Sequence, residues 1–219
     1  MSLELRETQD GSHTLYITEL DEHYHSYHGA IQEALHVFIN NGLNPLLKSK
    51  QLNILEVGWG TGLNSLLTCH YANSTLVRYT GLEPFPIEKE CSSKLNYESR
   101  LLGVQKGLYD QIIDAPWEVE TFISPNFSIH KIKNFIQTWD TKLTFDLVYY
   151  DAFGPRAQAE MWERDTLEKV ISKMHAGSIL VTYCAKGQLK RDLVTLNCRV
   201  ETLPGPPGKR EMIRATKNK

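Results

Sequence analysis

The chain has 219 residues, of which 41% are hydrophobic and 23% charged, a composition that suits one well-buried soluble domain. No apolar run approaches the roughly 18 to 20 residues needed to cross a bilayer, and the polar segment 1–11 lacks the apolar core of a signal peptide, so we expect a cytoplasmic protein with no membrane partner. The net charge of −2 argues against a strongly basic nucleic-acid coat but leaves room for a local basic patch.

The cysteines are four in number and stand far apart, with no C-x-x-C pair: Cys69, Cys91, Cys184 and Cys198. This spacing indicates neither a zinc site nor a disulfide framework. We expect four buried thiols.

The N-terminal region begins with two alternating stretches within residues 4–18, on either side of Asp10-Gly11. This dipeptide is favoured where a hairpin turn needs positive φ, so the pattern predicts a β-hairpin. An amphipathic helix is expected to follow from about Ala30 to Asn40 and to end at Asn41-Gly42.

Between the predicted hairpin and helix lies a segment dense in polar rings, which holds His23, His25 and His28. Zinc takes imidazole nitrogens readily, so a metal site is one interpretation of this spacing. No carboxylate or cysteine completes a recognisable ligand set. We therefore expect no metal and favour a hydrogen-bonding loop that lines a pocket.

The segment from Asn53 to Asn64 combines a short apolar run, an acid near its end and glycines at every second position, followed by a helical pattern. This predicts a strand, a tight turn and a helix. Glycines let a ligand lie against the main chain, and the start of the helix offers unpaired N–H groups. The spacing Gly58-x-Gly60-x-Gly62 is not the dinucleotide pattern, and no lysine follows as in a P-loop, so a ligand without phosphates fits better. A glycine-rich turn without a ligand is the alternative.

A second strand is predicted over Val77 to Glu83, and it ends in a carboxylate. The acid lies about 20 residues after the glycines, the separation expected of a residue that holds ribose hydroxyls. Glu83 is therefore the candidate for ribose binding, although an acid also ends strands by chance.

The rest of the chain alternates helices with strands. Helices are expected from Leu63 to about Tyr71, from Ile87 to about Leu108, and over Gln158 to Met174 and Lys186 to Leu196, and strands over Asn126 to Lys133, Leu143 to Asp151, Ser178 to Cys184, Cys198 to Thr202 and Glu211 to Thr216. The alternation predicts an α/β fold with a parallel, doubly wound sheet whose last strand is antiparallel. We expect residues 1–45 to pack on a main domain of residues 46–219 as effectively one structural unit. Ligands bind beyond the carboxyl ends of such strands, where the glycine turn, Glu83 and Asp151 would meet.

Four segments carry a resemblance to one family: Gly58-Trp59-Gly60-Thr61-Gly62-Leu63-Asn64, Glu83-Pro84-Phe85-Pro86, Tyr150-Asp151-Ala152-Phe153-Gly154-Pro155 with Met161-Trp162, and Gly208-Lys209-Arg210-Glu211-Met212. The first, preceded by Glu56, is similar to motif I of the class I S-adenosylmethionine (SAM) methyltransferases. Together, over about Tyr24 to Ile213, they resemble the tRNA 5-aminomethyl-2-thiouridine methyltransferases of the MnmC and MnmD type.

The resemblance implies a Rossmann-like class I fold and transfer of a methyl group from SAM to the primary amine of 5-aminomethyl(-2-thio)uridine, at the wobble position in the anticodon region of tRNA. In the bifunctional form of this family, an FAD-dependent oxidase acts beforehand. We expect no FAD half here, so that another protein supplies the aminomethyl substrate. We also expect a monomer or weak oligomer.

The resemblance and the sheet-edge position together nominate the site residues. Asp151 is the catalytic candidate, because a carboxylate there can accept a hydrogen bond from the acceptor amine and stabilise positive charge developing on its nitrogen. The alternative is that Asp151 only caps its loop. The candidates for cofactor binding are Glu56, Gly58, Trp59, Gly60, Gly62, Asn64, Glu83, Asn134 and Asp151. Asn134 stands where many class I enzymes carry an acid that binds adenine.

The candidates for substrate binding are Tyr24, Ser26, His28, Phe153, Lys209 and Arg210. Lys209 and Arg210 follow a Pro-Gly turn and are predicted to meet tRNA phosphates, with a solvated charged turn as the alternative. Trp59 and Phe153 could stack on a base, and core packing is an equal alternative. Two other functions stay open: a SAM-type transferase acting on a small amine such as a polyamine, and a non-catalytic RNA-binding protein with a methyltransferase fold.

Overall fold

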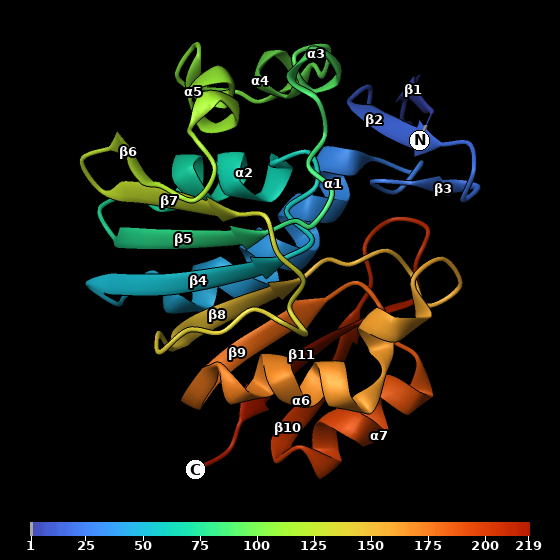
Figure 1. Ribbon diagram of the computed structural model, residues 1–219, viewed down its shortest axis with the longest axis vertical. Coiled ribbons are helices and arrows are strands. Elements are labelled where there is room, and N and C mark those ends of the chain that lie inside the picture. The colour runs from blue at the N-terminus through green and yellow to red at the C-terminus, as the bar shows by residue number, and fades with distance from the viewer. Residues whose placement is uncertain (1) are drawn as a thin grey trace.

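The computed structural model describes residues 2–219, and its centre is an eight-stranded sheet (Figure 1). The strands are β4 (Gln51–Val57), β5 (Leu76–Leu82), β6 (Glu120–Ser124), β7 (Phe127–Ile132), β8 (Phe145–Tyr150), β9 (Met174–Thr182), β10 (Cys198–Pro204) and β11 (Glu211–Lys217). Their order is β10-β11-β9-β8-β4-β5-β7-β6. The five central strands are parallel, whereas β6, β10 and β11 pair antiparallel with their neighbours. The predicted α/β fold with an antiparallel last strand is confirmed.

Helices cover both faces of this sheet. On one face lie α1 (Ala30–Ala34), the π-helix η1 (Leu35–Leu43), α2 (Leu63–Tyr71) and α5 (Leu108–Asp114), and on the other lie the 3-10 helix η3 (Ala159–Trp162), α6 (Arg164–Ser172) and α7 (Gly187–Thr195). Because successive side chains of a strand point to opposite faces, Leu147 of β8 packs with the first group and Val148 with the second. The nearly continuous apolar run of β8 is therefore buried on both sides, as its sequence predicts.

The N-terminal hairpin is confirmed and belongs to a small three-stranded sheet of β1 (Leu3–Glu7), β2 (His13–Ile17) and β3 (Glu22–His23). Gly11 provides the positive φ of the turn, at +77°. The Asp10 carboxylate accepts hydrogen bonds from the backbone N–H of Ser12 and of Gln32, at 2.9 Å each, and so joins the turn to α1. The short strand β3 was not predicted.

The prediction that the first helix ends at Asn41-Gly42 is wrong. The chain continues through η1 to Leu43 and then forms the 3-10 helix η2 (Asn44–Leu46). Gly42 is buried, and a Cβ atom there would lie 3.0 Å from Val181 and 3.2 Å from Tyr149. This glycine lets the helix approach the sheet closely, which is why it is present without ending the helix.

The predicted helix from Ile87 to Leu108 is broken in the structure. The region holds only two short helices, α3 (Lys89–Ser92) and α4 (Tyr97–Arg100), and α5 starts where the prediction ends. Gly103 and Gly107 have φ values of +75° and +80°, which a right-handed helix does not allow. The edge strand β6 was also missed.

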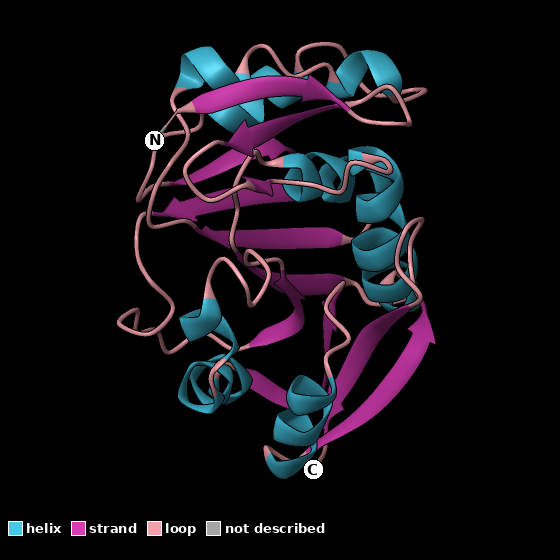
Figure 2. Cartoon of the chain, turned by 90° about the vertical axis from the view of Figure 1, so that its right-hand side faces the viewer, coloured by secondary structure: helices cyan, strands magenta, loops and turns pink. Residues whose placement is uncertain are grey.

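The strand ends that matter for function lie in one row. Val57 of β4 pairs with Leu82 of β5 on one side and with Tyr150 of β8 on the other, so three parallel strands end together. The small N-terminal sheet lies beside this edge, and the two chain ends lie at opposite ends of the molecule (Figures 1 and 2).

The structure also bears on the expectations about membrane-spanning segments and cysteines. Within residues 2–219, no helix is long and apolar enough to cross a membrane. Cys184 and Cys198 are buried thiols, whereas Cys69 and Cys91 are half-buried, so the expectation of four buried thiols holds for two. The division of the chain at residue 45 stays a prediction.

Candidate active site

The glycine turn after β4 is held against its two neighbouring strands by backbone hydrogen bonds. The N–H groups of Gly58 and Trp59 both donate to the Leu82 carbonyl oxygen at 3.0 Å, and the Asp151 N–H donates to the Val57 carbonyl oxygen at 2.9 Å. The turn therefore has a fixed position relative to the residues that follow β5 and β8.

All three glycines of the turn have positive φ, +88° for Gly58, +52° for Gly60 and +78° for Gly62. A Cβ atom at Gly58 would lie 2.7 Å from the Asp151 carbonyl oxygen, and one at Gly60 would lie 3.2 Å from the Tyr24 ring. Larger residues would be strained by both conformation and space. Bare backbone consequently forms this part of the edge.

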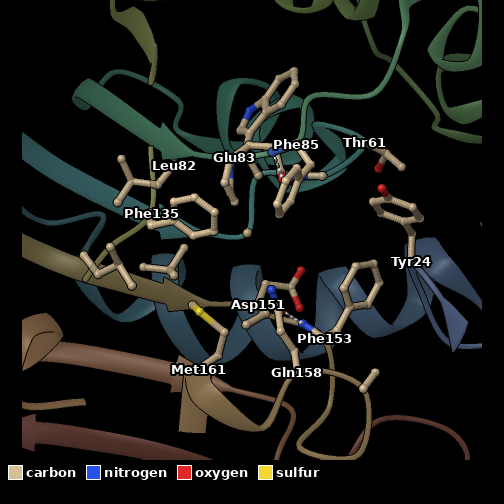
Figure 3. A pocket seen from close by; sticks show the side chains of 18 of the residues that line it. Tyr24, Thr61, Leu82, Glu83, Phe85, Phe135, Asp151, Phe153, Gln158 and Met161 are labelled. Carbon is tan, nitrogen blue, oxygen red and sulfur yellow. Dashed lines mark hydrogen bonds between the residues drawn. The ribbon is translucent and has the colours of Figure 1, made fainter. Parts of the chain in front are cut away.

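A cavity of about 210 Å³ opens above the turn. Figure 3 shows Glu83 and Phe85 on one wall, and Asp151 with Met161 on the opposite wall, from which the Asp151 carboxylate points into the space. The rings of Phe85 and Phe135 meet edge to face at its mouth, with centroids 5.5 Å apart. These two side chains are 55% and 44% exposed, which is unusual for phenylalanine and favours a ligand that covers them.

Glu83 lines the cavity and has both carboxylate oxygens engaged with the main chain. One accepts from the Gly60 N–H at 3.0 Å and the other from the Phe85 N–H at 2.9 Å. Burial raises the pKa of this carboxyl, and the two N–H donors oppose that shift. Each oxygen keeps a further lone pair for a ligand hydroxyl.

Asn64, in the first turn of α2, links two acids. Its Nδ2 donates to Glu56 Oε1 at 2.7 Å and to Asp151 Oδ2 at 2.8 Å. Glu56 is 1% exposed, does not line the cavity, and also accepts from the Tyr79 hydroxyl at 2.6 Å. Burial raises the pKa of Glu56 well above its usual range. Glu56 thus lies behind the cavity and acts on it through Asn64.

The Asp151 carboxyl group points into the first cavity. The pKa of Asp151 is raised from 3.8 to about 7. Burial is the main cause and the Glu33 charge adds to it, whereas the Asn64 hydrogen bond and the Lys209 charge oppose the rise. A carboxyl with this pKa can accept or release a proton near neutral pH.

A second cavity, of about 230 Å³, adjoins the first. The residues that line both are Tyr24, His25, Asp151, Ala152 and Phe153. The Tyr24 and Phe153 rings meet edge to face with centroids 5.0 Å apart, between the two spaces. Burial raises the pKa of Tyr24, so its hydroxyl stays protonated. Asp151 therefore lies where the two cavities meet.

The structure places the two neighbouring basic residues Lys209 and Arg210 differently. The Lys209 ammonium lies in the second cavity, donates a hydrogen bond to Glu33 Oε2, and stands 3.9 Å from the centroid of the Tyr183 ring. The Arg210 side chain is 94% exposed, with Glu211 at 3.9 Å. Only Arg210 has the exposed position that a contact to a nucleic-acid backbone requires.

Trp59 and Asn134, both nominated for cofactor binding, border the first cavity but also make contacts away from it. The Trp59 indole packs inward, with its N–H donating to Ser65 Oγ at 3.2 Å and its ring against Trp117. Asn134 borders the first cavity, although its Oδ1 accepts hydrogen bonds from its neighbours Phe135 and Thr138.

Ser26 lines the second cavity, whereas His28 does not. The His28 Nδ1 lies 2.9 Å from Gln9 Oε1, and its ring lies against Gly208 of the C-terminal turn. His28 thus connects the N-terminal segment to the turn that carries Lys209.

The three histidines of the N-terminal segment diverge. The His23 ring packs against Tyr16 in a tilted arrangement with centroids 4.8 Å apart, and the His25 Nε2 lies 3.3 Å from Thr61 Oγ1. Burial lowers the pKa of His25 to about 4, so it is neutral at physiological pH. Within residues 2–219, no group of three or more His, Cys, Asp or Glu side chains could hold a metal ion.

Several residues of the two cavities were not nominated from the sequence: Glu33, Phe85, Phe135 and Tyr183. Phe85 lies within the quoted Glu-Pro-Phe-Pro segment, so a signal for it existed. Glu33 sits in the first turn of an amphipathic helix, where an acid is ordinary, and only the fold reveals that it faces Lys209.

The chain is similar to known SAM-dependent methyltransferases. A family model described as S-adenosyl-L-methionine-dependent methyltransferase matches residues 118–218. The tRNA 5-methylaminomethyl-2-thiouridine biosynthesis bifunctional protein MnmC of Cupriavidus metallidurans is 30% identical over 214 residues, which cover 91% of this chain and 32% of that protein. MnmC of Leptospira interrogans is 28% identical over 89% of this chain and 32% of that protein. The chain thus spans about a third of the length of the curated relatives it matches.

Solved structures agree with this fold. MnmC2 from Aquifex aeolicus superposes with a TM-score of 0.78 at 24% identity, over 98% of this chain and 70% of that chain. A spermidine synthase in complex with a transition-state analogue gives a TM-score of 0.60 at 13% identity, over 99% of this chain and 70% of that chain. The predicted Rossmann-like methyltransferase architecture is confirmed.

Proposed function

We propose that this methyltransferase transfers the methyl group of SAM to the primary amine of 5-aminomethyl(-2-thio)uridine at the wobble position of tRNA, giving 5-methylaminomethyl(-2-thio)uridine. The observation that carries the proposal is the position of Asp151, whose carboxylate lies where a nucleotide-type cavity meets a second, acidic and aromatic cavity. The names of the MnmC relatives, with which the chain is similar over about nine-tenths of its length, supply the substrate class.

The first cavity fits SAM. The backbone of the glycine turn gives a surface against which the ligand can lie, and a Cβ atom at Gly58 would clash with the Asp151 carbonyl group. Glu83 would accept the ribose hydroxyls with its remaining lone pairs. Phe85 and Phe135 would enclose the adenine ring, with Asn134 at that end of the cavity.

The amino-acid end of SAM would lie toward Asn64 and Asp151. Asn64 is 2% exposed, and its Oδ1 has no hydrogen-bond partner among residues 2–219. A buried carbonyl oxygen without a donor is costly, so a ligand ammonium group that donates to it would remove a penalty. SAM supplies a methyl carbon that is activated by the adjacent sulfonium.

The second cavity would hold the acceptor. An alkyl ammonium must lose a proton before its nitrogen can attack a methyl carbon, and a carboxylate with a pKa of about 7 is suited to accept that proton near neutral pH. Asp151 would first take one proton from the ammonium. The nitrogen–carbon bond would then form as the sulfur–carbon bond breaks, giving a neutral thioether and a secondary ammonium product. Tyr24 and Phe153 would keep the two reactants aligned and exclude water.

The acceptor is a base within an RNA, so it must leave its stack to reach this depth. The aromatic side chains that line the second cavity, Tyr24, Tyr27, Phe153 and Tyr183, offer surfaces for such a base. Outside, the exposed Arg210 would contact the phosphates of the anticodon region, together with the exposed residues Lys186 and Arg191 of the neighbouring α7 region.

The experiment is methyl transfer from labelled SAM to tRNA isolated from cells that lack the modification, followed by mass analysis of the nucleosides. We expect one added methyl group on 5-aminomethyluridine species, and none when the tRNA lacks the aminomethyl group. Polyamines serve as the competing acceptors. Methylation of a free polyamine but not of tRNA would refute the proposal and support a small-amine transferase.

A further inference from the structure

The second cavity contains an ammonium group with more donors than partners. An ammonium carries three N–H donors, and among residues 2–219 the hydrogen-bond partner of the Lys209 Nζ is Glu33. The Tyr183 ring supports the same group from a distance of 3.9 Å. Glu33 is itself held, since its Oε1 accepts from the Ser26 N–H at 3.3 Å. Lys209 is thus fixed on one side and keeps donors for a ligand.

The surroundings of this ammonium favour a flat base over a phosphate. The Lys209 side chain is 32% exposed and lies in a cavity lined by aromatic rings, and two carboxylates, Glu33 and Asp151, would repel a phosphate. Arg210, the next residue along the chain, is 94% exposed and free of these restrictions. Arg210 therefore suits a contact to the RNA backbone, and Lys209 suits a contact to the base.

The chemistry of the acceptor supplies a partner for Lys209. In 5-aminomethyluridine the reacting amine is attached through one carbon to C5 of the ring, and C5 is bonded to C4, which carries a carbonyl oxygen. When the amine approaches Asp151, this oxygen must lie a few ångströms away in the same cavity. Lys209 borders that cavity with Asp151.

We propose that Lys209 is a specificity-determining residue that donates a hydrogen bond to the 4-carbonyl oxygen of the acceptor uracil, and that Glu33 is the residue that positions it. This inference rests on the proposed function, since it assigns the acceptor base to the second cavity. A cytosine carries an amino group at the same ring position, so the Lys209 ammonium would reject it. The positive charge also disfavours the protonated form of the nearby acceptor amine, which is the form that cannot react.

The test uses an anticodon stem-loop that contains 5-aminomethyluridine, and a second stem-loop in which the 4-oxygen of that base is replaced by sulfur, a weaker acceptor. For the wild-type enzyme, the sulfur substitution should lower kcat/KM by roughly 10-fold or more, the range for a hydrogen bond to a charged donor. Lys209→Met should lower kcat/KM for the oxygen substrate by a similar factor and be nearly insensitive to the sulfur substitution. Lys142→Met, an exposed change in the loop before β8, is the matched control that keeps wild-type behaviour.

Glu33→Gln tests the positioning role. This change removes the carboxylate that holds Lys209 but keeps Lys209 itself, so we expect a raised KM for the stem-loop and an unchanged affinity for SAM. Glu33→Asp, which keeps a carboxylate, should reverse part of the rise in KM. A merely structural role for Glu33 would instead reduce SAM affinity and thermal stability together.

Salt dependence separates base from phosphate contacts. Arg210→Met should reduce the slope of log Kd for tRNA against log salt by about 0.7 to 0.9, as expected for one lost phosphate contact, and Lys209→Met should leave the slope unchanged. Equal sensitivity of wild type and Lys209→Met to the sulfur substitution, or a reduced slope for Lys209→Met, overturns the inference. Should Lys209→Met fail to fold, the sulfur effect on the wild-type enzyme alone decides. Failure of the wild-type enzyme to methylate the oxygen stem-loop would refute the proposed function instead.

Discussion

Replacing Asp151 with asparagine should separate SAM binding from methyl transfer. The change keeps the shape of the side chain, and Asn64 Nδ2 can still donate to an amide oxygen at this position. What is lost is the ability to accept a proton. Since positioned general bases typically contribute 10²- to 10⁴-fold, we expect kcat to fall by at least about 100-fold while the affinity for SAM changes by less than about tenfold.

The pH profile gives the second expectation for this variant. The reactive form of Asp151 is the carboxylate, and its pKa of about 7 predicts that kcat/KM of the wild-type enzyme falls with decreasing pH below about 7. The residual activity of Asp151→Asn should lack this fall, which is the acid limb of the pH profile. Initial rates with labelled SAM and substrate tRNA between pH 5.5 and 9 would give the pH profile, and calorimetry would give the affinity for SAM. Transfer within threefold of wild type at pH 8, with the limb intact, would refute the role of Asp151.

The same pKa predicts that Asp151 destabilises the fold at neutral pH. Its folded pKa of about 7 exceeds its ordinary value of 3.8, so the folded state binds more protons between these values, and stability falls as pH rises through this window. The shift corresponds to at most roughly 4 kcal/mol, and we expect less because the residue is only half-buried and water screens its charge. Asp151→Asn should therefore raise Tm more at pH 7.5 than at pH 4.5. An equal change in Tm at both values would contradict the shift.

Other predictions follow from neighbouring contacts. Gly58→Ala should weaken SAM binding at least tenfold by calorimetry, since φ is +88° and the new Cβ would lie 2.7 Å from the Asp151 carbonyl oxygen. Phe135→Ala should cost roughly 1 kcal/mol of SAM affinity, and equal affinity would remove Phe135 from the adenine site. Besides burial, the Glu33 charge raises the pKa of Asp151 and the Lys209 charge lowers it, so the acid limb of kcat/KM should move to lower pH in Glu33→Gln and to higher pH in Lys209→Met. Shifts in the same direction would contradict this arrangement.

The central sheet could be predicted because its signals are local. The run from Leu143 to Asp151 and the glycine turn each specify their conformation within about ten residues, and parallel strands with helical crossovers permit few arrangements. The two wrong helix predictions both involve glycines, because a glycine can serve more than one structural purpose. Gly42 permits close packing within a helix, whereas Gly103 and Gly107 break the chain between helices, and the sequence shows the same residue in each case.

The meeting of Gly58, Glu83 and Asp151 at one cavity could be predicted for the same reason. Gly58, Glu83 and Asp151 each follow a strand, so the topology alone brings them to one edge. Their contacts were less predictable: Glu56 lies behind the cavity instead of in it, and the Trp59 indole packs into the core. Both side chains belong to a motif whose backbone, more than its side chains, forms the cavity wall.

The acceptor side depends on contacts between distant parts of the chain. Glu33 and Lys209 are 176 positions apart, and each is ordinary in its own segment, an acid in the first turn of a helix and a lysine in a Pro-Gly turn. Only when the N-terminal segment lies across the strand ends does Lys209 turn inward while Arg210 stays in solvent. On the proposed function, a local motif would therefore indicate the methyl donor, whereas the acceptor would be selected by two distant segments that periodicity and spacing do not connect. Exchanging residues 26–33 or 205–210, none of which lines the first cavity, should consequently alter the acceptor and leave SAM affinity unchanged.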